Sequence, residues 1–230
     1  MKLYLDIETK RPHEDSAFIE EEIIVIGVIE DLDEQTKRFK FFPLWDTEIN
    51  NEGKLVREFY KYLGNVRKHA KKQDKTIVIV GFNILRFDMP LLIQKGFEYK
   101  VDSLSGLNKF WHDMIVIDYM QASSPFYSIR FKDLRLETLM GKAKAIGLNV
   151  EERYGSGKDV VKWFENKEYD KIIKHLKAYL EAVRVIDQHY RRFYSTLAKE
   201  AFGAQTSRVF LSEKPSSSSN WRNKDIGHRM

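Results

Sequence analysis

The order of the strand-like segments constrains the fold of this chain more than any other feature. Residues 2–7 and 36–45 alternate apolar and polar side chains, and residues 22–31 form a β-branched run, so three strands with short connections are expected. A fully apolar run at 76–83 is typical of a buried parallel strand, and a further apolar strand is expected at 113–118. Strands that come first as a group and then alternate with helices predict an α/β fold with one mixed five-stranded sheet flanked by helices.

Helical segments follow the first three strands and then alternate with the last two. The segment 47–64 places apolar side chains at helical spacing and ends at Gly64, a residue type that is common after a helix C-terminus. The basic segment 67–75 contains no Phe, Tyr or Trp and is expected to be a solvated loop. Further helices are predicted to begin at about Asp88 and to lie within 133–147 and 158–200.

One domain is expected over residues 1–200, with a helical C-terminal extension that ends in a tail at residues 201–230. Of the 230 residues, 43% are hydrophobic, which is enough for a single well-buried core. Residues 201–230 include a serine-rich stretch with scattered apolar groups. This tail is expected to be partly mobile or to dock on a neighbouring copy of the chain, which would make the protein a homo-oligomer.

Composition excludes several classes of protein. The chain has no cysteine, so disulfide scaffolds, thiolate zinc sites and thiol nucleophiles are excluded. No apolar run is long enough for a membrane span, and the first residues do not resemble a secretion signal, so a cytoplasmic protein is expected. The net charge of +5 fits a polyanionic partner, but dense mixed charge is equally typical of proteins from hot environments.

A pair of acids on the first strand is the first candidate for chemistry. Asp6 and Glu8 are two residues apart, so their side chains project from the same face of the sheet. Two neighbouring carboxylates raise each other's pKa unless a cation lies between them, and Mg²⁺ or Mn²⁺ prefers such oxygen ligands. The alternative is a solvated strand face that carries two acids without a function.

A third acid follows the buried strand at 76–83. Asp88 lies at the start of the next helix, after a short turn that Asn83 is suited to close through its own side chain. The alternative interpretation makes Asp88 the N-cap of that helix. Together Asp6, Glu8 and Asp88 indicate a phosphodiester hydrolase that uses two metal ions.

The segments LYLDIET, with Asp6 and Glu8, and GFNILRFDMPLL, with Asp88, resemble the first two motifs of the DEDD superfamily of 3′-5′ exonucleases. The resemblance covers about residues 1–195 and is greatest to the tyrosine branch and to the proofreading domains of family B DNA polymerases, here as a small stand-alone protein of archaeal type. It implies an RNase H-like fold and hydrolysis of DNA, in particular single-stranded DNA, to nucleoside 5′-monophosphates. It also implies that Asp6, Glu8 and Asp88 hold two Mg²⁺ or Mn²⁺ ions. An exoribonuclease, a nucleic-acid-binding module with impaired catalysis and a structural domain that binds a protein remain alternatives.

The third motif departs from the pattern of this family. Tyr179 fits the tyrosine that would orient the attacking water, although a core tyrosine is an equally good interpretation, but the position four residues later is Val183 rather than aspartate. Asp187 lies one turn further, rotated by only about 40° and displaced by about 6 Å, and is therefore the predicted fourth ligand. The alternatives are that Asp187 pairs with Arg184 or Arg191, or that three carboxylates form the whole site.

Substrate contacts require cations beside aromatic rings, because a single strand is held through its phosphates and bases. No histidine shows the spacing of a metal ligand, and Asp118, at the end of a strand, is expected only near the site. The candidate substrate-binding residues are Asn83, Arg86, Phe87, Phe126, Tyr127 and Arg130.

Overall fold

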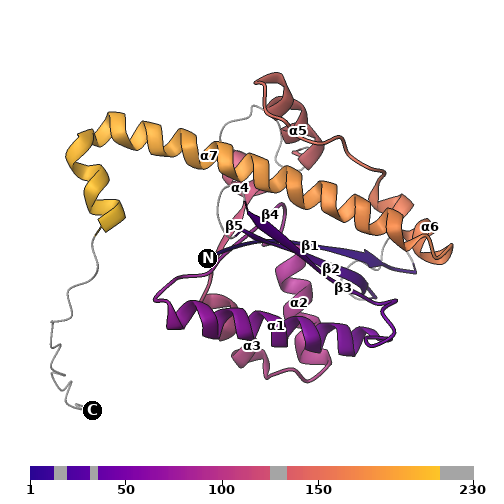
Figure 1. Cartoon of the computed structure of the whole chain (residues 1–230). Coiled ribbons are helices and arrows are strands. Elements are labelled where there is room, and N and C mark those ends of the chain that lie inside the picture. The colour runs from indigo at the N-terminus through magenta and orange to yellow at the C-terminus, as the bar shows by residue number, and fades with distance from the viewer. Residues whose placement is uncertain (13–19, 32–35, 125–133, 213–230) are drawn as a thin grey trace, which may run out of the picture. The chain divides into compact units, whose positions relative to one another are not determined.

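The computed structural model describes residues 1–12, 20–31, 36–124 and 134–212, with side chains described as far as residue 196. In these ranges the chain forms a sheet with the strand order β3-β2-β1-β4-β5 (Figure 1). β1 pairs antiparallel with β2, which pairs antiparallel with β3, whereas β1, β4 and β5 are parallel. The predicted mixed five-stranded sheet is confirmed. Its strands are β1 (Lys2–Lys10), β2 (Glu22–Asp31), β3 (Lys37–Pro43), β4 (Val78–Gly81) and β5 (Ile115–Asp118).

Helices cover both faces of this sheet (Figure 1). One face packs on α1 (Glu52–Lys72), α2 (Asp88–Glu98) and α3 (Leu104–His112), and their apolar side chains form one core with alternate residues of β1, such as Leu3 and Leu5. The first part of α7 (Tyr169–Ser212) crosses the other face. Gly27 of β2 permits this crossing, because a Cβ atom there would lie 2.6 Å from the side chain of Leu176.

The remaining helices are α4 (Tyr119–Ser123), α5 (Leu136–Ala145) and α6 (Gly157–Glu165). The sequence did not predict α3 and α4. The chain divides into two compact units, Met1–Gln188 and His189–Met230. Since α7 continues to Ser212, the first residues of the expected tail are helical, and residues 213–230 lie outside the described part. No helix in the described ranges is both long and apolar enough to cross a membrane.

The prediction that a helix ends at Gly64, before a solvated loop, is wrong. α1 continues through Gly64 to Lys72, because its apolar stripe continues with the buried residues Val66 and Ala70. The basic side chains of this segment therefore lie in the last turns of a helix, where cations interact favourably with the exposed carbonyl groups. The turn after the helix contains Asp74 and Lys75.

Candidate active site

Asp6 and Glu8 of β1 line the same cavity, as their spacing requires. The cavity has a volume of about 380 Å³ and is also lined by Asp88 and by His175 and Tyr179 of α7. The pairing of β1 with β2 is irregular immediately after Glu8. Such irregularities are common beside active sites, because they change the direction of the neighbouring side chains.

Asp88 is the first residue of α2, and the interpretation of Asp88 as an N-cap is wrong. The N-cap residue is Phe87, and Asp88 Oδ1 instead accepts a hydrogen bond of 3.1 Å from the backbone N–H of Ile7. This bond joins the start of α2 directly to β1, between Asp6 and Glu8. The three acids therefore come from two elements that are held together at the cavity.

Asp118, at the end of β5, holds the turn that carries Asp88. Its carboxylate is 3% exposed and accepts hydrogen bonds from the backbone N–H groups of Asn83 (2.8 Å), Leu85 (3.2 Å) and Met120 (2.9 Å). Asn83 has a φ of 63°, a left-handed conformation that asparagine tolerates better than most residues. Asp118 is therefore a positioning residue for the turn, and its own oxygens are used by the backbone.

The acids at the cavity are crowded, and their negative charges repel one another. Burial raises the pKa of Asp88 to about 7, with further contributions from the charges of Glu8 and Asp118. Burial, followed by the charges of Asp88 and Glu8, raises the pKa of Asp6 well above its usual range. A divalent cation between these groups would remove the mutual repulsion.

The donor set fits a hard divalent ion, because it consists of carboxylate oxygens. In the described residues, however, no three His, Asp or Glu side chains are already arranged as a metal site. Asp6, Glu8 and Asp88 line one cavity and act on one another electrostatically. A metal ion would thus have to draw these side chains closer together.

The metal-free protein is expected to lose stability as the pH rises. Asp88 ionises near 3.8 in the unfolded chain and near 7 in the folded protein, so the folded protein binds more protons between these values and stability falls with pH. In the presence of a chelator, we expect the free energy of unfolding in urea to be about 2 kcal/mol lower near pH 8 than near pH 5 because of this group. The difference between wild type and Asp88→Asn measures this contribution together with the effect of the Asp88 charge on Asp6, and parallel profiles of the two proteins would contradict it.

α7 lies antiparallel to β1 and matches its spacing. Residues four apart on a helix are about 6 Å apart along the axis, and residues two apart on a strand are separated by nearly the same distance. His175 contacts Glu8, the charge of Asp6 acts on Tyr179, and Asp187 contacts Tyr4 and Lys2. Val183 lies between Tyr179 and Asp187 along the helix and is 2% exposed.

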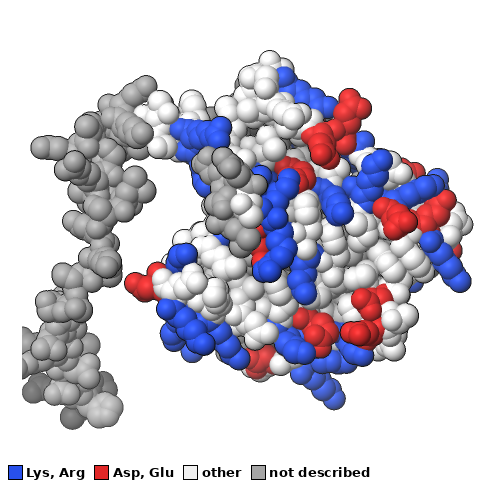
Figure 2. All heavy atoms as spheres, viewed as in Figure 1, with Lys and Arg blue, Asp and Glu red and all other residues white. Residues whose placement is uncertain are grey.

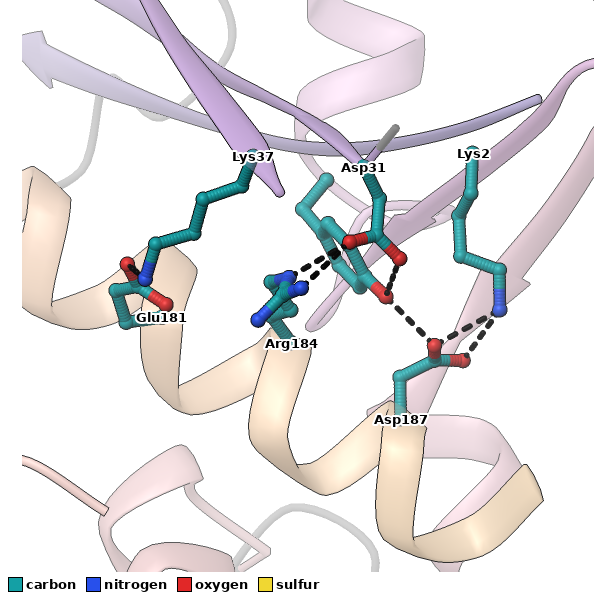
Figure 3. A network of polar contacts seen from close by, with 7 residues as sticks. Lys2, Asp31, Lys37, Glu181, Arg184 and Asp187 are labelled. Atoms are coloured by element: carbon teal, nitrogen blue, oxygen red, sulfur yellow. Dashed lines mark hydrogen bonds and ion pairs between the residues drawn. The ribbon is translucent and has the colours of Figure 1, made fainter. Parts of the chain in front are cut away.

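Asp187 lies away from the cavity, in a buried polar network (Figure 3). Lys2 Nζ donates to both of its oxygens, at 2.8 and 3.0 Å. The hydroxyl groups of Tyr4 and Tyr119 donate to it at 2.7 and 2.9 Å, and Asp187 is completely buried. The structure therefore does not bring Asp187 together with Asp6, Glu8 and Asp88.

Asp187 has an ion-pair partner that the sequence analysis did not name. Arg184 pairs with Asp31 of β2, at 2.7 Å, and Lys2 takes the place opposite Asp187 (Figure 3). Tyr4 connects the two ion pairs, because its hydroxyl lies 2.7 Å from Asp187 and 3.4 Å from Asp31. This network joins α7 to the sheet and has a structural role.

His175 is a site residue that the sequence analysis did not assign. Its Nε2 lies 3.1 Å from Glu8 Oε1, and its Nδ1 faces the carbonyl oxygen of Tyr154. Both partners accept hydrogen bonds, so a ring that donates to both is an imidazolium. Burial lowers the pKa of His175, but the hydrogen bond and charge of Glu8 outweigh burial and the pKa is raised. His175 and Tyr179 are four residues apart and therefore lie on one face of a helix. This spacing is the sequence signal that could have identified His175.

Tyr179 lines the cavity, and so do two of the three predicted substrate-binding residues that the structure describes. Burial, and after it the charge of Asp6, raises the pKa of Tyr179 well above its usual range, so its hydroxyl keeps its proton. Asn83 and Phe87 line the cavity, whereas Arg86 is exposed and is not among the lining side chains. Phe126, Tyr127 and Arg130 lie outside the described residues.

Two cations at the cavity were missed by the sequence analysis. Arg135 and Arg153 line it, and Arg153 forms an ion pair with Glu137 of α5, which also lines the cavity. Neither arginine belongs to a recognisable motif, and Arg153 reaches the site from the irregular segment before α6. Both supply positive charge beside the acids.

The sequence from residue 3 to residue 200 matches the RNase H superfamily. Among solved structures, the chain is similar to the family B DNA polymerase from the hyperthermophilic archaeon Pyrobaculum calidifontis, with 15% identity and a TM-score of 0.56 over 82% of this chain and 24% of the polymerase. It is also similar to E. coli exonuclease I in complex with a dT13 oligonucleotide, with 14% identity and a TM-score of 0.44 over 91% of this chain and 42% of that one. No curated protein matches the sequence.

This chain spans less than half the length of both solved proteins, and the likeness to the polymerase concerns the fold. The family match extends over most of the chain and agrees with the mixed sheet, its strand order and its helices on both faces. The chain therefore belongs to the RNase H superfamily.

Proposed function

We propose that this protein is a metal-dependent 3′-5′ exonuclease that hydrolyses single-stranded DNA to nucleoside 5′-monophosphates. The observation that carries the proposal is the meeting of Asp6, Glu8 and Asp88 at one cavity in an RNase H superfamily fold. The mutual repulsion of these acids favours a bound cation, and Arg135 and Arg153 supply charge for a phosphate at the same cavity.

Asp6, Glu8 and Asp88 would hold Mg²⁺ or Mn²⁺ through their carboxylate oxygens. Such ions supply Lewis acidity and lower the pKa of a bound water. Tyr179 lines the same cavity and keeps its proton at neutral pH, because its pKa is raised, and in this proposal its hydroxyl would orient the attacking water. The water oxygen bonds to phosphorus as the bond to the 3′ oxygen of the preceding nucleotide breaks, which releases a nucleoside 5′-monophosphate and a strand shortened by one nucleotide.

His175 keeps Glu8 in place from the other side of the cavity. Its ring is fixed at one nitrogen by the carbonyl of Tyr154 and contacts Glu8 with the other. A carboxylate held in this way loses less conformational freedom when it binds a ligand. In this proposal His175 is a positioning residue, and Asp187 belongs to the network between α7 and β1.

The second candidate is a nucleic-acid-binding module with impaired catalysis. It is favoured by Val183, a buried apolar residue at the position where the family pattern has a fourth acid. Asp187 does not compensate for it, since Asp187 is bound by Lys2, Tyr4 and Tyr119. The two candidates differ in cleavage and agree in binding.

A cleavage assay separates the two candidates. We expect wild-type protein with Mg²⁺ or Mn²⁺ to shorten a 5′-labelled single-stranded oligonucleotide from its 3′ end in steps of one nucleotide, and a chelator to stop the reaction. Val183→Asp is the informative variant. If the wild type is inactive and Val183→Asp cleaves, the impaired module is correct, whereas comparable activity of the two supports a site of three carboxylates.

The preference for DNA is tested in the same assay. DNA and RNA strands of one sequence are digested side by side, and we expect faster shortening of DNA. Faster shortening of RNA would make the protein an exoribonuclease and would leave the assignment of Asp6, Glu8 and Asp88 unchanged. Labelling the 3′ end as well as the 5′ end establishes the direction of attack.

A further inference from the structure

A second hollow lies beside the start of β4, at the end of the parallel strands opposite the candidate active site. It has a volume of about 650 Å³ and lies between the C-terminal end of α1, the start of β4 and the end of α3. Thr76 and Ile77 line it and precede β4, whereas Asp88 follows the other end of that strand. Lys2 at the start of β1 pairs with Val78, the residue after Ile77, which puts the hollow about 16 Å from Asp6 along β1.

The lining of this hollow is rich in cations. All four come from the end of α1 and the residues directly after it, and Figure 2 shows Lys and Arg side chains gathered at the lower left, over this end of α1. Two acids, Asp74 and Asp113, also line the hollow, and Asp113 pairs with one of the cations. The cations are Arg67, Lys68, Lys71 and Lys75.

Three of these cations are not neutralised within the described part of the chain. Arg67 pairs with Asp113, but Lys68, Lys71 and Lys75 form no ion pair with any carboxylate among the described residues. Exposed lysines at the end of a helix are ordinarily solvated. Here, however, they line one side of a hollow, so their positive charge is concentrated there.

An aromatic ring completes the hollow and comes from a different part of the chain. Phe110 of α3 lines it and is half-buried, with the guanidinium carbon of Arg67 4.7 Å from the centre of its ring. Tyr60 packs against Phe110 at 5.6 Å between ring centres and supports it. Lysines that follow a backbone, together with an aromatic ring on which a base can stack, are the combination that binds single-stranded nucleic acid.

We propose that this hollow, formed by Arg67, Lys68, Lys71, Lys75 and Phe110, is a second binding site for single-stranded nucleic acid. It holds the strand at a distance from the 3′ end that enters the candidate active site. This inference rests on the proposed function for the identity of the strand, and on the charge and the ring of the hollow for the contact itself. The second site therefore strengthens the binding of long strands, which reach it, and does not change the binding of short strands.

The test measures how binding depends on salt. The double variant Lys71→Gln/Lys75→Gln is combined with Asp88→Asn, so that no strand is cleaved. Its binding to a fluorescent strand of about 16 nucleotides is measured by anisotropy at several salt concentrations. Each phosphate contact that is lost lowers the slope of log K against log salt by about 0.7 for a single strand. We expect the slope to fall by about 1.4 and the affinity to fall roughly tenfold.

The control removes the same charge elsewhere. Lys54→Gln/Lys162→Gln changes two exposed lysines that line neither hollow, and we expect the slope to stay at the wild-type value. An unchanged slope for Lys71→Gln/Lys75→Gln, or an equal fall for both double variants, would overturn the proposal. Phe110→Leu keeps the apolar volume and is expected to weaken binding of the long strand without changing the slope.

Cleavage distinguishes this proposal from the proposed function. With Asp88 intact, Lys71→Gln/Lys75→Gln is expected to cleave a strand of about 4 nucleotides as fast as wild type and to have a higher KM for the long strand. If no protein cleaves but the slopes differ as expected, the exonuclease is wrong and the binding site stands. If wild type cleaves and the slopes are equal, the binding site is wrong and the exonuclease stands.

Discussion

Replacing Asp88 by asparagine is expected to abolish cleavage and at the same time to stabilise the metal-free protein. Burial and the neighbouring charges of Glu8 and Asp118 make the ionised form of Asp88 unfavourable, and asparagine removes that charge. Its side-chain oxygen can still accept the hydrogen bond from Ile7 N–H. We expect cleavage to fall by about 10³-fold or more, and the free energy of unfolding near pH 8 to rise by about 2 kcal/mol.

Asp118→Asn is the matched control for this variant. Both aspartates are 3% exposed, but Asp118 uses its two oxygens to accept backbone hydrogen bonds from Asn83, Leu85 and Met120. An amide group at that position turns a donor toward another donor, so we expect a loss of about 2 kcal/mol in stability. Urea unfolding in the presence of a chelator measures both effects. If both variants lowered the stability, the charge repulsion assigned to Asp88 would be incorrect.

Replacing Asp187 by alanine is expected to cause the largest loss of stability. The carboxylate is completely buried, and its removal takes away an acceptor to which the ammonium group of Lys2 and the hydroxyl groups of Tyr4 and Tyr119 donate. Breaking a buried ion pair on one side typically costs about 3–5 kcal/mol. The free energy of unfolding of Asp187→Ala should therefore fall by about that amount, as measured in urea.

A neighbouring ion pair on α7 provides the control. Lys37 and Glu181 form a more exposed pair on the same helix (Figure 3), and Glu181→Gln should cost less than about 1 kcal/mol. The milder Asp187→Asn variant separates a structural role from a ligand role. We expect it to bind Mn²⁺ with wild-type affinity in a calorimetric titration. A folded Asp187→Asn protein of wild-type stability that no longer binds the ion would show that Asp187 is a ligand after all.

The local pattern of the sequence determined much of the fold. Alternation placed Asp6 and Glu8 on one face of β1, and the apolar run before Asn83 identified the parallel strand that precedes Asp88. These features depend on residues close together in the chain, whose geometry is set by the periods of strand and helix. The end of α1 was less predictable, because the apolar stripe of the helix continues past Gly64 with Val66 and Ala70.

Only the tertiary structure decided which elements meet. Periodicity indicates that residues 175, 179, 183 and 187 share one face of a helix, but the partner of that face is β1, at the other end of the sequence. This pairing directs His175 to Glu8 and Asp187 to Lys2, and so separates a site residue from a structural one on a single stripe. In the same way, α3 brings Phe110 to a basic segment that contains no Phe, Tyr or Trp. Sequence spacing fixes which side chains share a face, whereas packing over long separations decides what that face contacts.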